Sequence, residues 1–107
     1  MKTIARLSLA VLAVAFILSA TSFAADSGAD LYKAKCASCH GPDGKGDTAM
    51  GKSLKLKDLA SDDVQKMSDA DLSGIIEKGK KPMPAYEGKL SKDQITEVVK
   101  YIRTMKK

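Results

Sequence analysis

Five consecutive residues, Cys36-Ala37-Ser38-Cys39-His40, contain both cysteines and the only histidine of the 107-residue chain. The pattern C-x-x-C-H is the attachment signature of a c-type haem. Cysteines three positions apart lie on one face of a helical turn, so both thiols can reach the vinyl groups on one edge of a porphyrin. His40 follows directly, and the same turn can present its imidazole to the iron. The pentapeptide therefore predicts a covalent attachment site and one axial ligand.

The same residues allow other chemistry. A C-x-x-C pair also occurs as a dithiol redox centre, which needs a βαβ setting. A zinc site needs four ligands, whereas Cys36, Cys39 and His40 are the only cysteine and histidine residues in the chain. A structural disulfide would leave the adjacent histidine unexplained. Haem attachment explains the pentapeptide better than these alternatives. Evidence for a haem is therefore needed from the rest of the chain.

Residues 1–24 have the pattern of a secretory signal peptide. Lys2 and Arg6 precede an uncharged apolar run of 14 residues, and small residues follow. This order is typical of a cleaved signal, and the run is short for a membrane span of about 20 residues. We expect cleavage after Ala24, which leaves residues 25–107 as a single domain in the periplasm. An uncleaved membrane anchor is the alternative.

Export and small size both favour a bound cofactor. In an oxidising compartment two neighbouring cysteines tend to form a disulfide unless another reaction captures them, and thioether bonds to haem are such a reaction. A domain of about 80 residues usually needs a metal, disulfides or a cofactor to complete its core. Tyr32, Tyr86 and Tyr101 are the only aromatic residues after the signal segment. A buried porphyrin would supply the missing apolar surface.

The mature segment is predicted to be all-α, with no convincing strand. Serine and aspartate residues mark helix starts, and glycines mark stops. An apolar stripe runs along the last helix, and the Gly-Pro-rich segment after His40 is typical of a loop. The predicted helices cover residues 27–39, residues 62–67, a segment that starts at the cap-like residues 68–71 and stops at Gly79, and a final segment from Ser91, while residues 47–60 are ambiguous.

Met83 is the best candidate for a second axial ligand. It lies between Pro82 and Pro84, on a stretch with few backbone conformations, which suits a ligand that must be held at a fixed distance. Methionine sulfur is a known axial ligand of haem iron and raises its reduction potential. Methionine also fills gaps in cores, and three others compete, Met50, Met67 and Met105. Met67 is the leading rival.

With these residues in place, the chain resembles the small soluble bacterial cytochromes c that carry one haem with histidine–methionine ligation. The resemblance covers nearly all of residues 26–107. It rests on Cys36, Cys39 and His40, on the Gly-Pro-Asp-Gly-Lys-Gly segment that follows, and on residues 81–86 (Lys-Pro-Met-Pro-Ala-Tyr).

The resemblance implies a small cytochrome c fold, in which three to five helices wrap around one covalently attached haem. In this family the first and last helices pack together through a glycine and an aromatic residue. Gly28 and Tyr32 match the first helix, and Val98 and Tyr101 are their expected partners on the last helix.

The resemblance also implies a one-electron carrier and not an enzyme. Cys36, Cys39, His40 and Met83 would bind haem c, with His40 and Met83 as ligands of its iron. We expect the free ring N–H of His40 to donate to a backbone carbonyl near Pro42. The groups that meet the haem propionates remain open, with candidates Lys52, Lys55, Lys57 and Tyr86. Two alternative functions also remain open: a haem sensor or peroxidase-like protein with an open or labile sixth position, and a dithiol oxidoreductase.

The charge distribution suggests redox protein partners, whose identity the sequence does not give. The formal net charge is +5, and it falls to +3 without Lys2 and Arg6. Residues 58–77 carry one lysine against six acids, and residues 78–107 carry nine basic residues against three acids. Such asymmetry can steer a charged partner. We expect a monomer that binds no nucleic acid and docks its partners at a lysine-rich surface near Lys80, Lys81 and Lys89.

Overall fold

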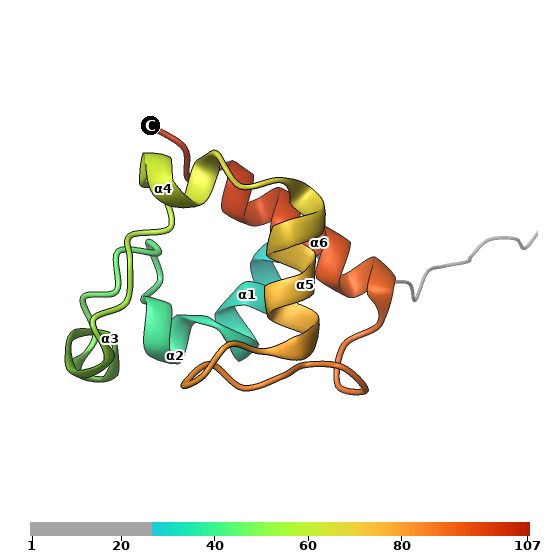
Figure 1. Ribbon diagram of the computed structural model, residues 1–107, viewed down its shortest axis with the longest axis horizontal. Helices are drawn as coiled ribbons and strands as arrows, with labels where there is room; N and C mark the ends of the chain where they lie inside the picture. The colour runs from blue at the N-terminus through green and yellow to red at the C-terminus, as the bar shows by residue number, and fades with distance from the viewer. Residues whose placement is uncertain (1–26) are drawn as a thin grey trace, which may run out of the picture.

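The computed structural model describes residues 27–107, and the predicted signal peptide and its cleavage point lie outside this range. The described residues form six helices and no extended strand. They are α1 (Gly28–Lys35), α2 (Ala37–His40), α3 (Ala49–Leu54), α4 (Asp62–Gln65), α5 (Asp69–Lys78) and α6 (Lys92–Arg103). In Figure 1 the long helices α5 and α6 lie beside each other, with α1 behind them. The all-α prediction is confirmed.

The first and last helices pack against each other at Gly28. A Cβ atom built on Gly28 would lie 2.1 Å from the carbonyl oxygen of Glu97 and 3.1 Å from the Cβ of Tyr101. The rings of Tyr32 and Tyr101 lie beside this crossing, with centroids 5.2 Å apart. The predicted glycine–aromatic contact is therefore present. The backbone nearest to Gly28 is that of Glu97. Val98, which is predicted as a partner of the first helix, is the next residue and is fully buried.

Helix α6 supplies much of the core because its apolar residues recur on one face. Ile95, Val98, Val99 and Ile102 are buried. Leu31 of α1 and the buried Leu72 and Ile76 of α5 complete the packing around this stripe. The core is aliphatic apart from Tyr32.

Serine side chains start four of the helices, and three of them, Ser27, Ser68 and Ser91, are predicted from the sequence. Ser27, Ser61, Ser68 and Ser91 each accept a hydrogen bond from a backbone N–H in the first turn of α1, α4, α5 and α6. At α6 the side chain of Gln94 also accepts from the N–H of Ser91, which completes a capping box. Each such cap stabilises its helix by about 1 kcal/mol.

The structure differs from the predicted elements in detail. The helix predicted over residues 27–39 divides at Cys36 into α1 and α2. The ambiguous stretch 47–60 contains α3, which Thr48 caps. There is one helix more than the expected upper limit of five in the described range, because α2 and α4 are single turns of four residues each.

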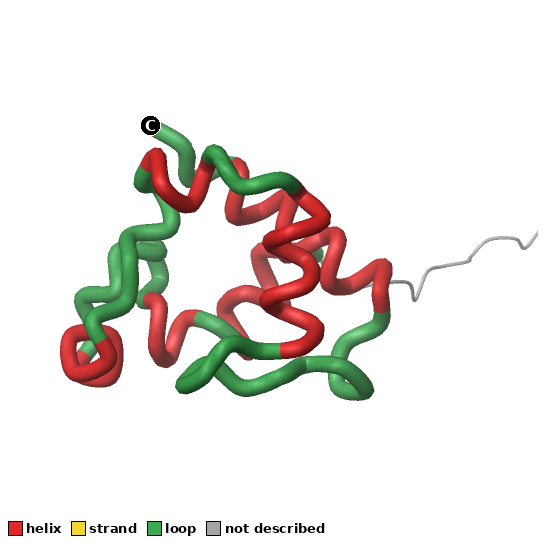
Figure 2. The backbone as a smooth tube through the Cα atoms, viewed as in Figure 1, coloured by secondary structure: helices red, strands yellow, loops and turns green. Residues whose placement is uncertain are grey.

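The helices and loops are arranged around a ring. Figure 2 shows the backbone as a ring, with α5 and α6 on one side and α2 and α3 on the other. The segment around α4 closes the ring at one end, and the loop after α5 closes it at the other.

Substitution of Gly28 by alanine tests the helix crossing. The new methyl group would overlap the Glu97 carbonyl, so α1 and α6 must move apart. We expect the free energy of unfolding to fall by about 1–3 kcal/mol, measured by denaturant titration. Gly74→Ala in α5 is the matched control, because no atom lies within 4 Å of its added methyl group. The control should gain up to about 1 kcal/mol from higher helix propensity. Equal effects of both substitutions would contradict the close crossing.

Candidate functional site

The Cys36–His40 pentapeptide forms a tight turn at the junction of α1 and α2. The N–H groups of Cys39 and His40 both donate to the carbonyl of Cys36, at 3.2 and 2.9 Å. Both cysteines are free and half-buried. The predicted arrangement of two thiols and an imidazole on one turn is therefore present.

Three contacts hold this turn in place. The buried hydroxyl of Tyr32 donates to the carbonyl of Gly41 at 2.7 Å. The N–H of Gly46 donates to the carbonyl of His40 at 2.7 Å. The hydroxyl of Thr48 donates to the carbonyl of Cys39 at 2.6 Å. Helix α1 and the loop after His40 thus both contact the C-terminal end of the pentapeptide and hold it in place.

Two further supports of the turn, Thr48 and Gly51, are not among the residues predicted from the sequence. A Cβ atom on Gly51 would lie 2.7 Å from the carbonyl oxygen of Cys39 and 2.4 Å from that of Gly46. Only a glycine allows α3 to approach so closely. The Thr-x-x-Gly spacing was the available signal, because the N–H of Gly51 donates to the Thr48 hydroxyl in an N-terminal cap.

A cavity of about 310 Å³ lies beside the pentapeptide. This volume is at the lower end of the roughly 300–1,000 Å³ of cofactor and ligand sites. A smaller lobe of about 50 Å³ adjoins it. Five residues line both lobes: Cys36, His40, Leu56, Pro82 and Met83. The two lobes therefore form one site that contains one cysteine, the histidine and one methionine at their junction.

The walls of the larger lobe are mainly aliphatic and come from distant parts of the chain. Leu56 and Leu59 precede α4, Val64 belongs to α4, and Ile75 and Ile76 belong to α5. Cys39 and Tyr86 line the smaller lobe. The site is an apolar chamber with thiols at one end.

Burial sets the protonation states of the site. Burial lowers the pKa of His40 below its ordinary value, so the imidazole is neutral at pH 7, the form in which histidine binds metals. Burial and the nearby Cys39 thiol raise the pKa of Cys36 to about 11. Both groups are therefore uncharged in this chamber.

The ring nitrogen Nδ1 of His40 is buried and has no hydrogen-bond partner among residues 27–107. The predicted bond from the histidine ring to a carbonyl near Pro42 is thus not present. Unpaired buried nitrogens are rare in native proteins. An orphaned imidazole nitrogen beside two free thiols, a thioether and aliphatic walls fits a covalently bound haem. The zinc alternative has no support, because residues 27–107 contain no cluster of three or more metal-binding side chains.

Met83 closes a tight turn in a short loop that begins at Gly79. The N–H of Lys80 donates to the carbonyl of Met83 at 3.1 Å, and the N–H of Met83 donates to the carbonyl of Lys80 at 2.7 Å. The loop is fastened to the pentapeptide side by the hydroxyl of Tyr86, which donates to the carbonyl of Lys35 at 3.0 Å. These bonds place Met83 at the junction of the two lobes, with His40.

None of the other methionines in the described chain lines both lobes. Met67 lines the larger lobe but not the smaller one. Met50 is an exposed residue of α3, with 51% of its surface accessible. Met105 approaches Gly44 and lines neither lobe. Met67 therefore remains the one rival of Met83 within the described chain.

The predicted propionate candidates separate into three groups. Lys55 and Lys57 line the larger lobe, away from Cys39, while Tyr86 lines the smaller lobe beside the cysteines. Lys52 lines neither lobe. Sequence analysis did not consider Lys80 and Lys81 for this role, although both line the larger lobe. The position of these two lysines beside the larger lobe depends on the conformation of the loop after Gly79, which the sequence does not show.

Comparison with known proteins gives consistent matches over most of the chain. The family model described as "Cytochrome C oxidase, cbb3-type, subunit III" matches residues 23–102. Cytochrome c6 of Nostoc sp. strain PCC 7120 is 37% identical over 105 residues, covering 89% of this chain and 87% of that protein. Cytochrome c6 of Synechococcus sp. strain PCC 6312 is 34% identical over 98 residues, covering 90% of this chain and 85% of that protein.

Solved structures agree with the sequence matches. The KustC0563 c-type cytochrome superposes with a TM-score of 0.71 at 31% identity, covering 77% of this chain and 100% of that chain. The helical fold and the thiol-lined chamber thus define the class, that of the small c-type cytochromes. The chain belongs to the cytochrome c family, as a monohaem electron carrier that holds haem c covalently and is not an enzyme. No helix among residues 27–107 has the length and apolar character to cross a membrane.

Gly79→Ala tests the geometry of the Met83 loop. Gly79 has φ +78°, and an added Cβ would lie 2.8 Å from the N of Ala85 and 2.9 Å from the carbonyl oxygen of Met83. Gly88 is a matched control, because its φ is +85° but no atom lies within 4 Å of an added Cβ. Both substitutions carry the backbone strain of a positive φ, about 1–3 kcal/mol. Gly79→Ala adds overlap, and its ψ of 166° lies in a region that is essentially restricted to glycine. We expect Gly79→Ala to lower the free energy of unfolding by about 1–3 kcal/mol more than the control. Equal losses in denaturant titration would contradict the tight loop.

Proposed function

We propose that the protein is a periplasmic electron carrier in which Cys36 and Cys39 form the thioether bonds and His40 and Met83 are the axial ligands of the haem iron. The observation that carries this proposal is that His40 and Met83 both lie at the junction of two lobes, of which Cys36 lines both and Cys39 lines the smaller one. The signal-like pattern of residues 1–24 supports export to the periplasm.

The haem iron, when bound, supplies the one-electron exchange, and the protein supplies its environment. A neutral His40 can bind iron without first losing a proton, because burial lowers the pKa of its ring. The sulfur of Met83 favours the reduced iron and raises the reduction potential. The aliphatic walls formed by Leu56, Leu59 and Val64 limit the access of water. A filled sixth position and an apolar chamber both favour electron transfer over ligand binding.

Replacement of Met83 by alanine tests the ligand assignment. We expect the variant to lose the absorption band of the sulfur–iron bond, to have a lower reduction potential, and to bind cyanide or carbon monoxide much faster than the wild type. The control is Met67→Ala, which removes a sulfur from the same lobe. This control should keep the band. Loss of the band in Met67→Ala and its retention in Met83→Ala would reverse the assignment.

The same preparations test the rest of the proposal. Protein matured with the haem-attachment machinery should keep its colour after denaturation, because thioether bonds survive unfolding. Loss of the haem on denaturation would refute covalent attachment. Fast binding of carbon monoxide to the wild type would show an open sixth position and favour a haem sensor.

We further propose that redox partners dock through acidic groups at the mouth of the larger lobe. Lys80 and Lys81 are exposed and line this lobe. Neither forms an ion pair with another described residue, and Lys89 lies beside the loop with its ammonium 5.8 Å from the Tyr86 ring centroid. The lysines in ion pairs are Lys57, Lys66, Lys78, Lys100 and Lys107. The free charges are thus available to a partner of opposite sign.

Charge reversal at Lys80 and Lys81 tests the docking surface. The double substitution Lys80→Glu and Lys81→Glu should slow the reaction with ferricyanide, an anionic oxidant, by about tenfold at low ionic strength. The matched control is Lys45→Glu with Lys106→Glu, which changes the net charge equally at residues that line neither lobe. Stopped-flow rates at several salt concentrations give the comparison. Equal slowing of both double variants would show that only the net charge matters.

A further inference from the structure

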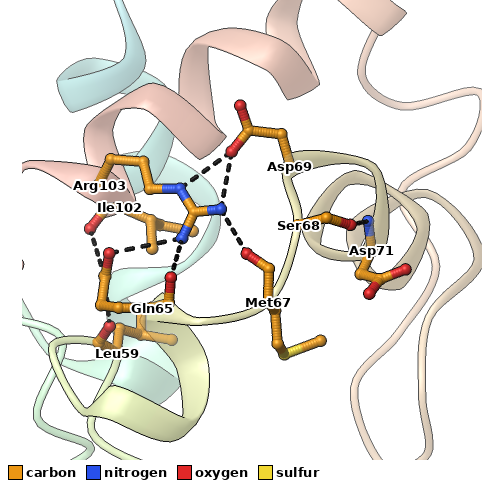
Figure 3. A network of polar contacts seen from close by, with 8 residues as sticks. All are labelled: Leu59, Gln65, Met67, Ser68, Asp69, Asp71, Ile102 and Arg103. Atoms are coloured by element: carbon orange, nitrogen blue, oxygen red, sulfur yellow. Dashed lines mark hydrogen bonds and ion pairs between the residues drawn. The ribbon is translucent and has the colours of Figure 1, made fainter.

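The guanidinium of Arg103, at the end of α6, binds three points between the last residue of α4 and the first residue of α5 (Figure 3). Its Nη1 donates to the carbonyl of Gln65 at 2.8 Å, and its Nη2 donates to the carbonyl of Met67. Its Nε and Nη2 contact one carboxylate oxygen of Asp69, at 2.9 and 2.8 Å. We call this set of contacts the Arg103 clamp. Its partners lie 34 to 38 residues earlier in the chain.

The side chain of Gln65 extends the clamp to the residues before α4. Its amide nitrogen donates to the carbonyl of Leu59 at 2.8 Å and to that of Ile102 at 3.0 Å. Its amide oxygen faces Nη1 of Arg103 at 3.5 Å. Arg103 and Gln65 together attach the whole segment 59–69 to the last turn of α6.

This segment forms one wall of the larger lobe. Leu59, Asp63, Val64 and Met67 all line it. Helix α4 has only four residues, and Val64 is its one buried residue. Such a short helix is unstable by itself, so its position depends on contacts with the rest of the protein. The clamp supplies these contacts, and a planar guanidinium that binds several acceptors holds them in a fixed geometry.

We propose that Arg103 and Gln65 are positioning residues that set the reduction potential, because they hold the wall of segment 59–69 closed over the haem. This inference rests on the proposed function, since it places the haem in the larger lobe. Neither residue lines either lobe. They act through Leu59, Val64 and Met67, which their hydrogen bonds hold in position.

The direction of the effect follows from solvation. Burial of a haem disfavours the extra positive charge of the oxidised iron, which raises the potential. A loosened wall admits water, stabilises the oxidised form and lowers the potential. Loss of the Arg103 charge could shift the potential in the same direction, so the test must separate charge from position.

Two variants remove the clamp without a change in net charge. Arg103→Lys keeps the positive charge but loses the forked geometry that reaches several acceptors. Gln65→Met keeps the side-chain length but loses the bonds to Leu59 and Ile102. Lys100→Met is the control, because it removes a charge from α6 at an exposed residue whose ion pair is with Glu97.

We expect both clamp variants to keep the haem and the sulfur–iron band but to have reduction potentials below the wild type in spectroelectrochemical titration. Lys100→Met should leave the potential unchanged. The potential of the Arg103→Lys/Gln65→Met double variant should fall by less than the sum of the single shifts, because both changes release the same wall.

A purely structural clamp would give a different result. The melting temperatures of the variants would fall while their potentials stayed at the wild-type value, and this result would overturn the inference. Shifts that add fully in the double variant would also overturn it. Failure of the proposed function would appear separately, as a wild-type protein that lacks the sulfur–iron band.

Discussion

The close crossing of α1 and α6 at Gly28 is the contact on which the rest of the structure depends. The Glu97 carbonyl leaves no room for a side chain there, and this fixes α1 against α6, which contributes more buried residues than any other described helix. The C-terminal end of α1 carries the cysteine–histidine turn, and the C-terminal end of α6 carries Arg103. One helix crossing therefore places the pentapeptide on one side of the chamber and anchors the α4 segment on the other side.

Much of this arrangement could be predicted from local sequence. Serine caps, the Gly79 stop and the apolar stripe of α6 are signals within a few residues, and all are present in the structure. The division of the first helix at Cys36 and the Arg103 clamp could not be predicted. The clamp joins residues 34 or more positions apart, and its acceptors include backbone carbonyls, which leave no mark on the sequence. The Thr48 bond to Cys39 was missed for a similar reason.

The site combines an apolar interior with a charged mouth. Burial keeps His40 and Cys36 uncharged, whereas Lys80 and Lys81 stand exposed where the larger lobe opens. Under the proposed function, the interior would favour a reduced, six-coordinate haem, and the two lysines would favour encounter with an acidic partner. The loop from Gly79 to Tyr86 contributes to both, because it carries Met83 and the two lysines. A short loop thus couples the proposed iron ligand to the proposed docking surface.

The proposed function requires one haem between His40 and Met83, bonded to Cys36 and Cys39. A crystal structure of the matured protein, with the iron located by its anomalous scattering, tests it most directly. We predict thioether bonds to both cysteines, the imidazole of His40 on one face of the iron and the sulfur of Met83 on the other. Iron bound by Met67, or iron with no protein ligand opposite His40, would contradict the account.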